Sequence, residues 1–220
     1  MKYRSVFDII GPIMIGPSSS HTAGAARIGK VARSLFRRQP EWVDIHLYGS
    51  FAKTYKGHGT DVAIIGGILD FETDDERIIR SIEIAEAAGM VIRFFEEAAV
   101  PDHPNTVKIR MGDENSDMEM VGISIGGGKI EIIELNSFVL RLSGQHPAIL
   151  VEHTDKTGVI ANVATVLARY EINIGHMEVS RKEKGKKALM TIEVDQNIKD
   201  VILDEIEELP SILGVTKIVD

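Results

Sequence analysis

The fold of the C-terminal third is decided by the stretch AILVEHTDKTGVIANVATVLARYEINIGHMEV at residues 148–179. Its opening residues, 148–153, form a compact apolar run that predicts a strand, and DKTG (155–158) predicts a turn. Apolar residues then recur at helical spacing across 159–170, which predicts a helix. The segment 172–179 is rich in β-branched residues and predicts a second strand.

The same pattern continues to the C-terminus. Residues 182–187 predict a charged, glycine-containing hairpin loop, and 188–195 alternate in the manner of a strand. An amphipathic helix is predicted at 198–209, where Pro210 follows as a stop signal, and a short strand at 214–220 closes the chain. The order β-α-β-β-α-β is the ferredoxin-like arrangement.

The first 147 residues predict helices followed by a mainly antiparallel sheet, an α+β pattern. Helices are predicted from about Thr22 to Arg38, at 61–71 and at 75–89. Strands are predicted at 42–48, 91–97, 105–111, 118–125, 129–135 and 138–144. Because SGQHP (143–147) has the polar, Gly- and Pro-containing composition of a linker between domains, we place the two domains at 1–147 and 148–220.

Composition and charge narrow the classes of function. With 44% hydrophobic and 26% charged residues, the 220-residue chain is typical of a globular protein. Its net charge of −8 comes from interspersed acidic and basic residues, whereas a nucleic-acid partner would require a clustered basic face. Asp8, Gly11 and Pro12 interrupt the apolar N-terminal stretch, so we expect no signal peptide, no membrane span and a cytoplasmic location.

Cysteine is absent from the sequence. The chain therefore cannot form a disulfide, offer a thiolate nucleophile, or ligate a metal or cluster through cysteine. The histidines outside the motifs described next show no metal-ligand spacing, and we expect them to be structural and this chain to hold no metal. They are His46, His103, His146, His153 and His176.

Hydroxyl groups and an imidazole crowd the motif GPSSSHT (16–22), directly ahead of a predicted helix. One hydroxyl would cap the helix, and the others exceed that need. A helix start also offers free amides and a positive dipole end, so the motif could bind a carboxylate or a phosphate, and His21 could move a proton near neutral pH. The residues alone leave a cap with a polar loop and an anion site as equal alternatives.

A second polar cluster, GHGTD (57–61), precedes the predicted buried helix. Taken alone, it favours a helix cap at Thr60 or Asp61. Since two histidine-bearing helix starts lie in one domain, His21 and His58 could instead face one pocket.

Two further motifs have simple structural interpretations. SIGGGKIEI (124–132) is superficially similar to a phosphate-binding loop but lacks the required order and leads into a strand, so it predicts a glycine hairpin. DKTG (155–158), with Asn173 and Ile174 at the next strand, is the tight turn and strand start of any ferredoxin-like domain.

The C-terminal domain resembles ACT domains, the regulatory modules of amino-acid metabolism, along the whole of residues 149–181. In that family, amino-acid ligands often lie between paired domains, against the first turn and the start of the second strand. The resemblance thus implies self-association, and ligand-binding roles for Asp155, Gly158, Asn173 and Ile174.

The N-terminal half resembles the domain of iron–sulfur-dependent L-serine dehydratases that carries GPSSSHT, followed by GSFAKTYKGHGTD (49–61) and SIGGGKIEI in the same order. With the ACT domain, the combination is similar to the beta subunits of the two-chain bacterial enzymes. The domain is also similar in fold to the allosteric substrate-binding domain of some phosphoglycerate dehydrogenases.

This resemblance implies β-elimination of water from L-serine, giving pyruvate and ammonia, with a 4Fe-4S cluster as Lewis acid. Since such clusters are held by cysteine thiolates, the cluster must belong to a partner alpha subunit. We expect the hydroxyl-rich helix start to hold the substrate carboxylate, His21 to orient substrate or relay a proton, and His58 to be a weaker partner. The residues expected to face the cluster are Ser18, Ser19, Ser20, His21 and Thr22.

Other functions are compatible with the chain to different degrees. A non-catalytic amino-acid-sensing regulatory subunit is the alternative, because a hydroxyl-rich helix start serves either role. A pyridoxal-phosphate dehydratase would need a Schiff-base lysine in a large catalytic domain, a setting that Lys53 and Lys56 lack. A metal-dependent hydrolase is disfavoured because no two histidines have ligand spacing.

Overall fold

A computed structural model describes residues 12–218 and divides the chain into two compact units, one ending at Asn136 and the other beginning at Ser137. The N-terminal positions Asp8 and Gly11, and the last two residues of the predicted final strand, lie outside the described residues. In the described part, no helix is long and apolar enough to cross a membrane.

The first unit combines helices with a mixed, mainly antiparallel sheet, as expected for an α+β fold. Its helical elements are η1 (Ser19–Ala23), α2 (Gly24–Phe36), α3 (Gly49–His58), α4 (Thr60–Ile68), η2 (Glu76–Arg80) and α5 (Ser81–Ala87). The strands of its sheet are β1 (Trp42–Tyr48), β2 (Val91–Glu96), β3 (Asn105–Gly112), β4 (Asp117–Gly126) and β5 (Lys129–Leu135). The last strand in the sheet order, β6 (Phe138–Leu142), comes after the division at Asn136. The strand order is β2-β1-β3-β4-β5-β6, in which β1 pairs in parallel with β2 and antiparallel with β3.

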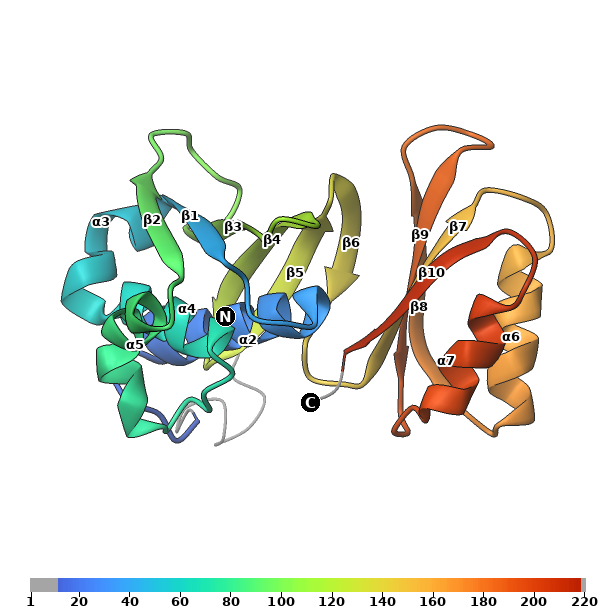
Figure 1. The fold of residues 1–220 in the computed structure, drawn as a ribbon, viewed down its shortest axis with the longest axis horizontal. Helices are drawn as coiled ribbons and strands as arrows, with labels where there is room; N and C mark the ends of the chain where they lie inside the picture. Colours follow the sequence, from blue (N-terminus) through green and yellow to red (C-terminus); the bar gives the residue numbers. More distant parts are fainter. Residues whose placement is uncertain (1–11, 219–220) are drawn as a thin grey trace. The chain divides into compact units, whose positions relative to one another are not determined.

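Helices α2 and α4 lie side by side in the first unit (Figure 1) and approach each other through glycines. A Cβ atom at Gly67 would overlap the carbonyl oxygen of Ala26, and one at Gly29 would overlap that of Ile64. On the sheet side, Ile28 of α2 packs against Gly122 of β4, where an added Cβ would lie 2.8 Å from its side chain. Small residues therefore set the distance between the two helices that begin at the GPSSSHT and GHGTD motifs.

Helix α3 was not predicted from the sequence, which assigned neither a helix nor a strand between the strand at 42–48 and the helix at 61–71. The segment contains two glycines and several polar residues, and it buries only Phe51 and Tyr55. It nevertheless forms a helix, because Gly49 and Gly59 adopt positive φ angles of 56° and 66° at its two ends. The chain thus passes from β1 directly into α3 and from α3 directly into α4.

The second unit confirms the predicted β-α-β-β-α-β order. Its elements are β7 (Ala148–Thr154), α6 (Val159–Arg169), β8 (Ile174–Arg181), β9 (Lys187–Val194), α7 (Asp200–Glu207) and β10 (Ile212–Ile218). The sheet order is β10-β7-β9-β8, and both helices cover one face of it (Figure 1). Its core contains Val151, Val163, Leu167, Ile192 and Ile206, all of them buried.

The division at Asn136 lies ahead of the domain boundary predicted after residue 147. The intervening segment belongs to the second unit: the amide and hydroxyl of Ser143 both donate to Glu193 Oε1 at 2.7 Å, and the Lys182 ammonium lies 4.8 Å from the centre of the Phe138 ring. The boundary after residue 147 stays a prediction from the sequence pattern.

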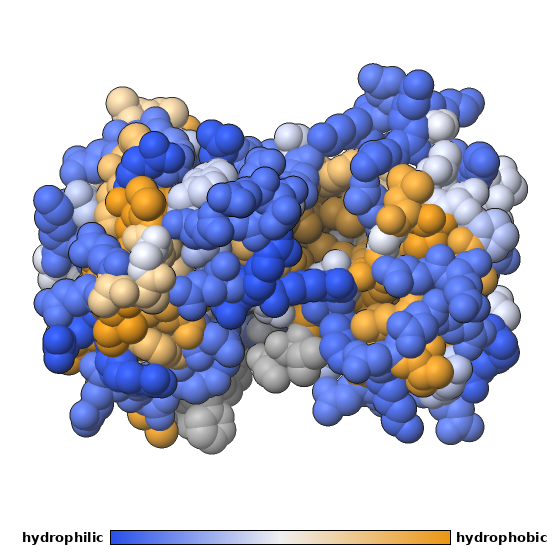
Figure 2. All heavy atoms as spheres, viewed as in Figure 1, coloured by the Kyte–Doolittle hydropathy of each residue, from blue (hydrophilic) through white to orange (hydrophobic). Residues whose placement is uncertain are grey.

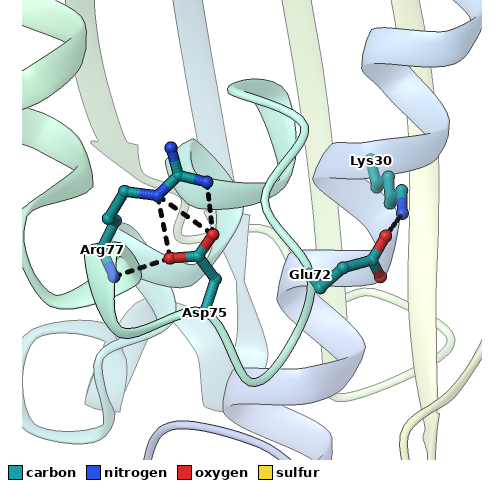
Figure 3. A network of polar contacts seen from close by, with 4 residues as sticks. All are labelled: Lys30, Glu72, Asp75 and Arg77. Carbon is teal, nitrogen blue, oxygen red and sulfur yellow. Dashed lines mark hydrogen bonds and ion pairs between the residues drawn. The ribbon is translucent and has the colours of Figure 1, made fainter.

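Charged side chains form polar contacts in the segment between α4 and η2. Lys30 of α2 forms an ion pair with Glu72, and the Asp75 carboxylate accepts the Arg77 amide at 2.9 Å at the start of η2 (Figure 3). These groups are exposed, so each pair contributes little to stability. Figure 2 shows polar residues over most of the visible surface of each unit, with apolar residues between them.

The α2–α4 contact gives a stability prediction. Replacing Gly67 with Ala should lower the free energy of unfolding of the first unit by about 1–3 kcal/mol, because the new methyl group must push the helices apart. Gly57→Ala is the matched control. It lies in exposed α3 with nothing within 4 Å of an added Cβ, so it should be neutral or stabilise by roughly 0.5–1 kcal/mol.

Urea unfolding followed by the fluorescence of Trp42, the only tryptophan, reports on the first unit. Equal unfolding midpoints for the Gly67 and Gly57 variants would contradict the close packing of α2 on α4.

Candidate functional site

The hydroxyl row of GPSSSHT forms a π-helical turn that leads into α2. Ser18 caps this turn, since its Oγ accepts the amide of His21 at 3.3 Å and its carbonyl accepts the amide of Thr22 at 2.8 Å. Ser19 opens the turn, and its carbonyl accepts the amide of Gly24. Ser18 alone supplies the side-chain cap of this turn. The other hydroxyl groups of the motif are therefore not needed for capping.

The imidazole of His21 is surrounded by serine hydroxyls. Its Nδ1 lies 3.1 Å from Ser20 Oγ and 3.3 Å from Ser18 Oγ, and these two oxygens are 3.3 Å apart. On the opposite side of the ring, Nε2 lies 3.0 Å from the Oγ of Ser50 in α3. Both ring nitrogens thus have hydroxyl partners, from two segments that are distant in the sequence.

His58 lies against His21, as the two-motif interpretation expected. The two ring centres are 4.9 Å apart with an angle of 86° between the planes, and Phe51 contacts the His21 ring edge-on at 5.3 Å. Thr22 Oγ1 donates to the His58 carbonyl at 3.3 Å. The buried Nδ1 of His58 has no hydrogen-bond partner among the described residues. It is therefore a buried polar atom whose hydrogen bond the described residues do not supply.

Burial changes the proton affinity of two groups near this cluster. Desolvation lowers the pKa of His21 below 6.5, and the neighbouring His58 lowers it further. His21 is therefore mainly neutral at pH 7. Burial also raises the pKa of the Asp61 carboxyl above its ordinary value, against the opposing effect of its hydrogen bond with the Val62 amide.

The expected cap at Thr60 or Asp61 is wrong in detail. Gly59 occupies the N-cap position of α4, with φ 66°, because only a residue that tolerates a positive φ can join α3 to α4 without a loop. Asp61 still accepts an amide of the first turn, that of Val62, at 2.9 Å. Thr60 is fully buried, and its hydroxyl has no partner in the described part of the chain.

The third motif confirms the hairpin interpretation and also approaches the first. Gly126, Gly127 and Gly128 have φ angles of 100°, 62° and 76° and turn β4 into β5. Ser124, just ahead of them, is fully buried, and an added Cβ at Gly24 would overlap its hydroxyl. The strand that leads into this hairpin thus packs against the start of α2, next to the π-helical turn.

Ser50 is the site residue that the sequence analysis missed. It lies in GSFAKTYKGHGTD, where the sequence analysis predicted no helix, and it approaches His21 because α3 begins at Gly49. The clue in the sequence was the presence of a hydroxyl residue near the start of the motif that also contains His58.

In the second unit, the predicted ligand residues fall into two groups. Asp155 accepts the amide of Gly185 at 3.0 Å and the guanidinium of Arg181 at 2.9 Å, and these bonds, that of Gly185 first, lower the pKa of its carboxyl. Gly158, with φ 91°, is the N-cap of α6, lies three residues after Asp155, and has open space beside it.

Asn173 and Ile174 lie at the other end of β8. The Asn173 amide donates to Gln196 and its side chain to Asp195, at 2.8 and 2.5 Å. Ile174 is the first residue of β8, whereas Arg181, which contacts Asp155, is the last. At about 3.3 Å per residue, the two groups are separated by roughly 23 Å. A single chain therefore does not bring them together around one small ligand.

No metal centre is formed by the described residues: no group of three or more His, Asp or Glu side chains could hold an ion. The absence of cysteine from the full sequence also means that this chain offers no thiolate to an iron–sulfur cluster. The donors gathered at the candidate site are hydroxyl and imidazole groups, which suit a carboxylate or hydroxyl ligand.

The environment of His21 predicts its titration. In an NMR pH titration of histidine signals, the midpoint of His21 should fall below 6.5, and His58→Gln should move it upward by removing the neighbouring charge. Because the unfolded chain binds this proton near pH 6.5 and the folded chain only at lower pH, the contribution of His21 to stability falls as the pH drops below 6.5. A wild-type midpoint above 6.5 would contradict the burial of this ring.

Comparisons with known proteins agree with these features. The family profile described as serine dehydratase beta chain matches residues 5–89, and that of the ACT domain matches 148–211. The probable L-serine dehydratase beta chain of Bacillus subtilis is 71% identical over 220 residues, which cover all of both chains. The L-serine dehydratase beta chain of Peptoniphilus asaccharolyticus is 41% identical over 210 residues, which cover 92% of this chain and 94% of the relative.

A D-3-phosphoglycerate dehydrogenase of Bacillus subtilis is also similar, with 27% identity over 202 residues that cover 89% of this chain and 37% of the relative. The two resemblances drawn from the motifs and from the C-terminal pattern are thereby confirmed. With 71% identity over the full length of both proteins, the chain belongs to the serine dehydratase beta chain family and carries a C-terminal ACT domain.

Proposed function

We propose that this chain is the beta subunit of an iron–sulfur L-serine dehydratase, which eliminates water from L-serine to give pyruvate and ammonia. Two relatives with high coverage are named as beta chains of L-serine dehydratase. The observation that carries the proposal is the convergence of GPSSSHT and GSFAKTYKGHGTD on one imidazole, His21, with hydroxyl groups at both ring nitrogens.

The cluster of such an enzyme belongs, in this proposal, to a separate alpha chain, because this chain lacks cysteine. When bound in the assembled enzyme, the 4Fe-4S cluster supplies a Lewis acid for the departing hydroxyl group of L-serine. The beta chain contributes binding and proton-handling groups from its own side of the site.

The start of the π-helical turn is suited to the substrate carboxylate. The first amides of a helix have no partner within the helix, and the dipole of the following α2 favours an anion there. Ser19 and Thr22 belong to this turn and are not hydrogen-bonded to the His21 ring. We assign carboxylate binding to this turn.

His21 is suited to accept or pass on a proton. Its lowered pKa keeps it neutral at pH 7, and a neutral imidazole can accept a proton during removal of the α-hydrogen. His58 packs against this ring at nearly a right angle and has a buried nitrogen without a partner among the described residues, so it is the second candidate for this role.

The direct test is reconstitution. The chain is co-expressed with a cysteine-bearing partner under anaerobic conditions, and pyruvate formation from L-serine is measured for the pair and for each chain alone. Activity of the pair alone supports the proposal. A partner that is fully active by itself would instead favour the amino-acid-sensing role, and activity of this chain by itself would refute a shared site.

The proton-handling role of His21 can be tested by substitution in the reconstituted pair. His21→Ala should lower kcat by roughly 10²–10⁴-fold, the range for loss of a general acid or base, while the subunits stay associated on size exclusion. His146→Ala is the control, because this histidine is exposed and lies outside the site. Near-normal turnover of the His21 variant would remove it from the mechanism.

The two groups of ACT residues predict a ligand site shared between two copies of the chain. Asp155→Asn and Asn173→Ala should each abolish calorimetric binding of L-serine to the second unit. Mixing the two variants should restore up to half of the sites, because a mixed pair has one site in which both residues are intact. Failure of the mixture to regain binding, with pairing retained, would contradict a shared site.

A further inference from the structure

We infer that Arg181 belongs to the ligand site proposed for the ACT domain, where it forms with Asp155 a receptor for both charges of a free amino acid. In this receptor, Asp155 Oδ1 accepts the ammonium group of the ligand, and the Arg181 guanidinium donates to the ligand carboxylate. The inference rests on the shared site proposed above. It adds a residue to that site and makes the ligand a zwitterion.

The carboxylate of Asp155 is bound through one oxygen only. Oδ2 accepts Nη1 of Arg181 at 2.9 Å and the Gly185 amide at 3.0 Å. Oδ1 accepts no hydrogen bond from any residue that the structure describes. Since an ionised carboxylate can accept hydrogen bonds at both oxygens, Asp155 has a free acceptor next to its ion pair.

This one-sided binding distinguishes Asp155 from the other aspartates that accept an arginine in the described part of the chain. Asp44 and Asp75 each accept their arginine at both oxygens. Asp113 accepts its arginine at Oδ2 and two backbone amides at Oδ1. The free oxygen is therefore a feature of Asp155 and not of such ion pairs in this chain generally.

Arg181 likewise keeps most of its donors. Its Nη1 bonds to Asp155, whereas Nε and Nη2 have no hydrogen-bond partner among residues 12–218. The side chain of Arg181 is 54% exposed and that of Asp155 is 23% exposed, so a ligand can reach both. A guanidinium presents five N–H groups in a planar fork, which suits a carboxylate.

The backbone fixes the position of the pair. Asp155 follows β7 and Arg181 ends β8, and the Asp155 amide donates to the Lys186 carbonyl in the β8–β9 hairpin at 2.7 Å. Gly185 adopts φ 77° in this hairpin, and its amide donates to Asp155 Oδ2. The hydrogen bonds from Gly185 and then from Arg181 lower the pKa of the Asp155 carboxyl below its ordinary value, so this carboxyl is ionised at neutral pH.

The pair is complementary to an amino acid. A free α-amino acid carries its ammonium and carboxylate groups on one carbon atom, so its receptor must present an anionic acceptor and cationic donors side by side. The free oxygen of Asp155 and the free N–H groups of Arg181 meet this requirement. An amine without a carboxylate would bring its positive charge near the guanidinium with no compensating contact, and a carboxylic acid without an amine would meet the corresponding repulsion at Asp155.

The test is calorimetric titration of the full chain at neutral pH with L-serine, with ethanolamine, which lacks the carboxylate, and with 3-hydroxypropionate, which lacks the ammonium group. The wild type should bind L-serine at least about tenfold more tightly than either analogue. Arg181→Gln should weaken L-serine binding by about 10–100-fold, the effect of losing a charged hydrogen bond, and should bind L-serine no better than ethanolamine. Arg181→Lys should recover part of the loss because it keeps the charge.

Arg169→Gln is the matched control. The side chain of Arg169 is 59% exposed and forms an ion pair with Glu205, and it lies at the end of α6, whereas Asp155 precedes the start of that helix. This variant should bind L-serine with wild-type affinity.

An Arg181→Gln chain that binds L-serine as tightly as the wild type, or that keeps the wild-type preference for L-serine over ethanolamine, would overturn the inference and leave the shared site in place. A wild-type chain that binds none of the three compounds would refute the shared site itself, and the inference with it.

Discussion

The close approach of α2 and α4 is the constraint on which the candidate site depends. Gly29 and Gly67 allow each helix to touch the backbone of the other, and the π-helical turn and His58 lie just ahead of the two helices. Any side chain at either glycine would separate the helices and with them the bond between Thr22 and the His58 carbonyl. Packing at this helix contact thus helps to position the polar groups of the candidate site.

Much of the fold could be predicted from the sequence because the second unit follows regular periodicity. Apolar residues such as Val163 and Leu167 recur at helical spacing, and they are buried in the core. Helix α3 could not be predicted in this way, since it buries only two large side chains and carries lysine, threonine and glycine elsewhere. Gly49 and Gly59 adopt positive φ angles at its two ends, and these angles are not visible in the sequence.

The candidate site was likewise predictable from the sequence in part only. The crowding of hydroxyls next to His21 is local and was visible in the sequence, and the pairing of His21 with His58 followed from their similar positions ahead of helices. Ser50 is separated from His21 by an entire helix and a strand, so only the folded chain reveals their contact. In the second unit, the distance between Asp155 and Asn173 follows from strand direction, and it is the reason for our proposal that a ligand site there is shared between two copies.

The central claim is that this chain supplies one side of a shared site and that a partner supplies the iron. The most direct measurement is an anaerobic crystal structure of the two-chain complex with L-serine bound. The account predicts that the amino acid lies against the π-helical turn, with its carboxylate at the first amides and the His21 cluster beside it. A substrate enclosed wholly by the partner, with His21 facing solvent, would contradict it.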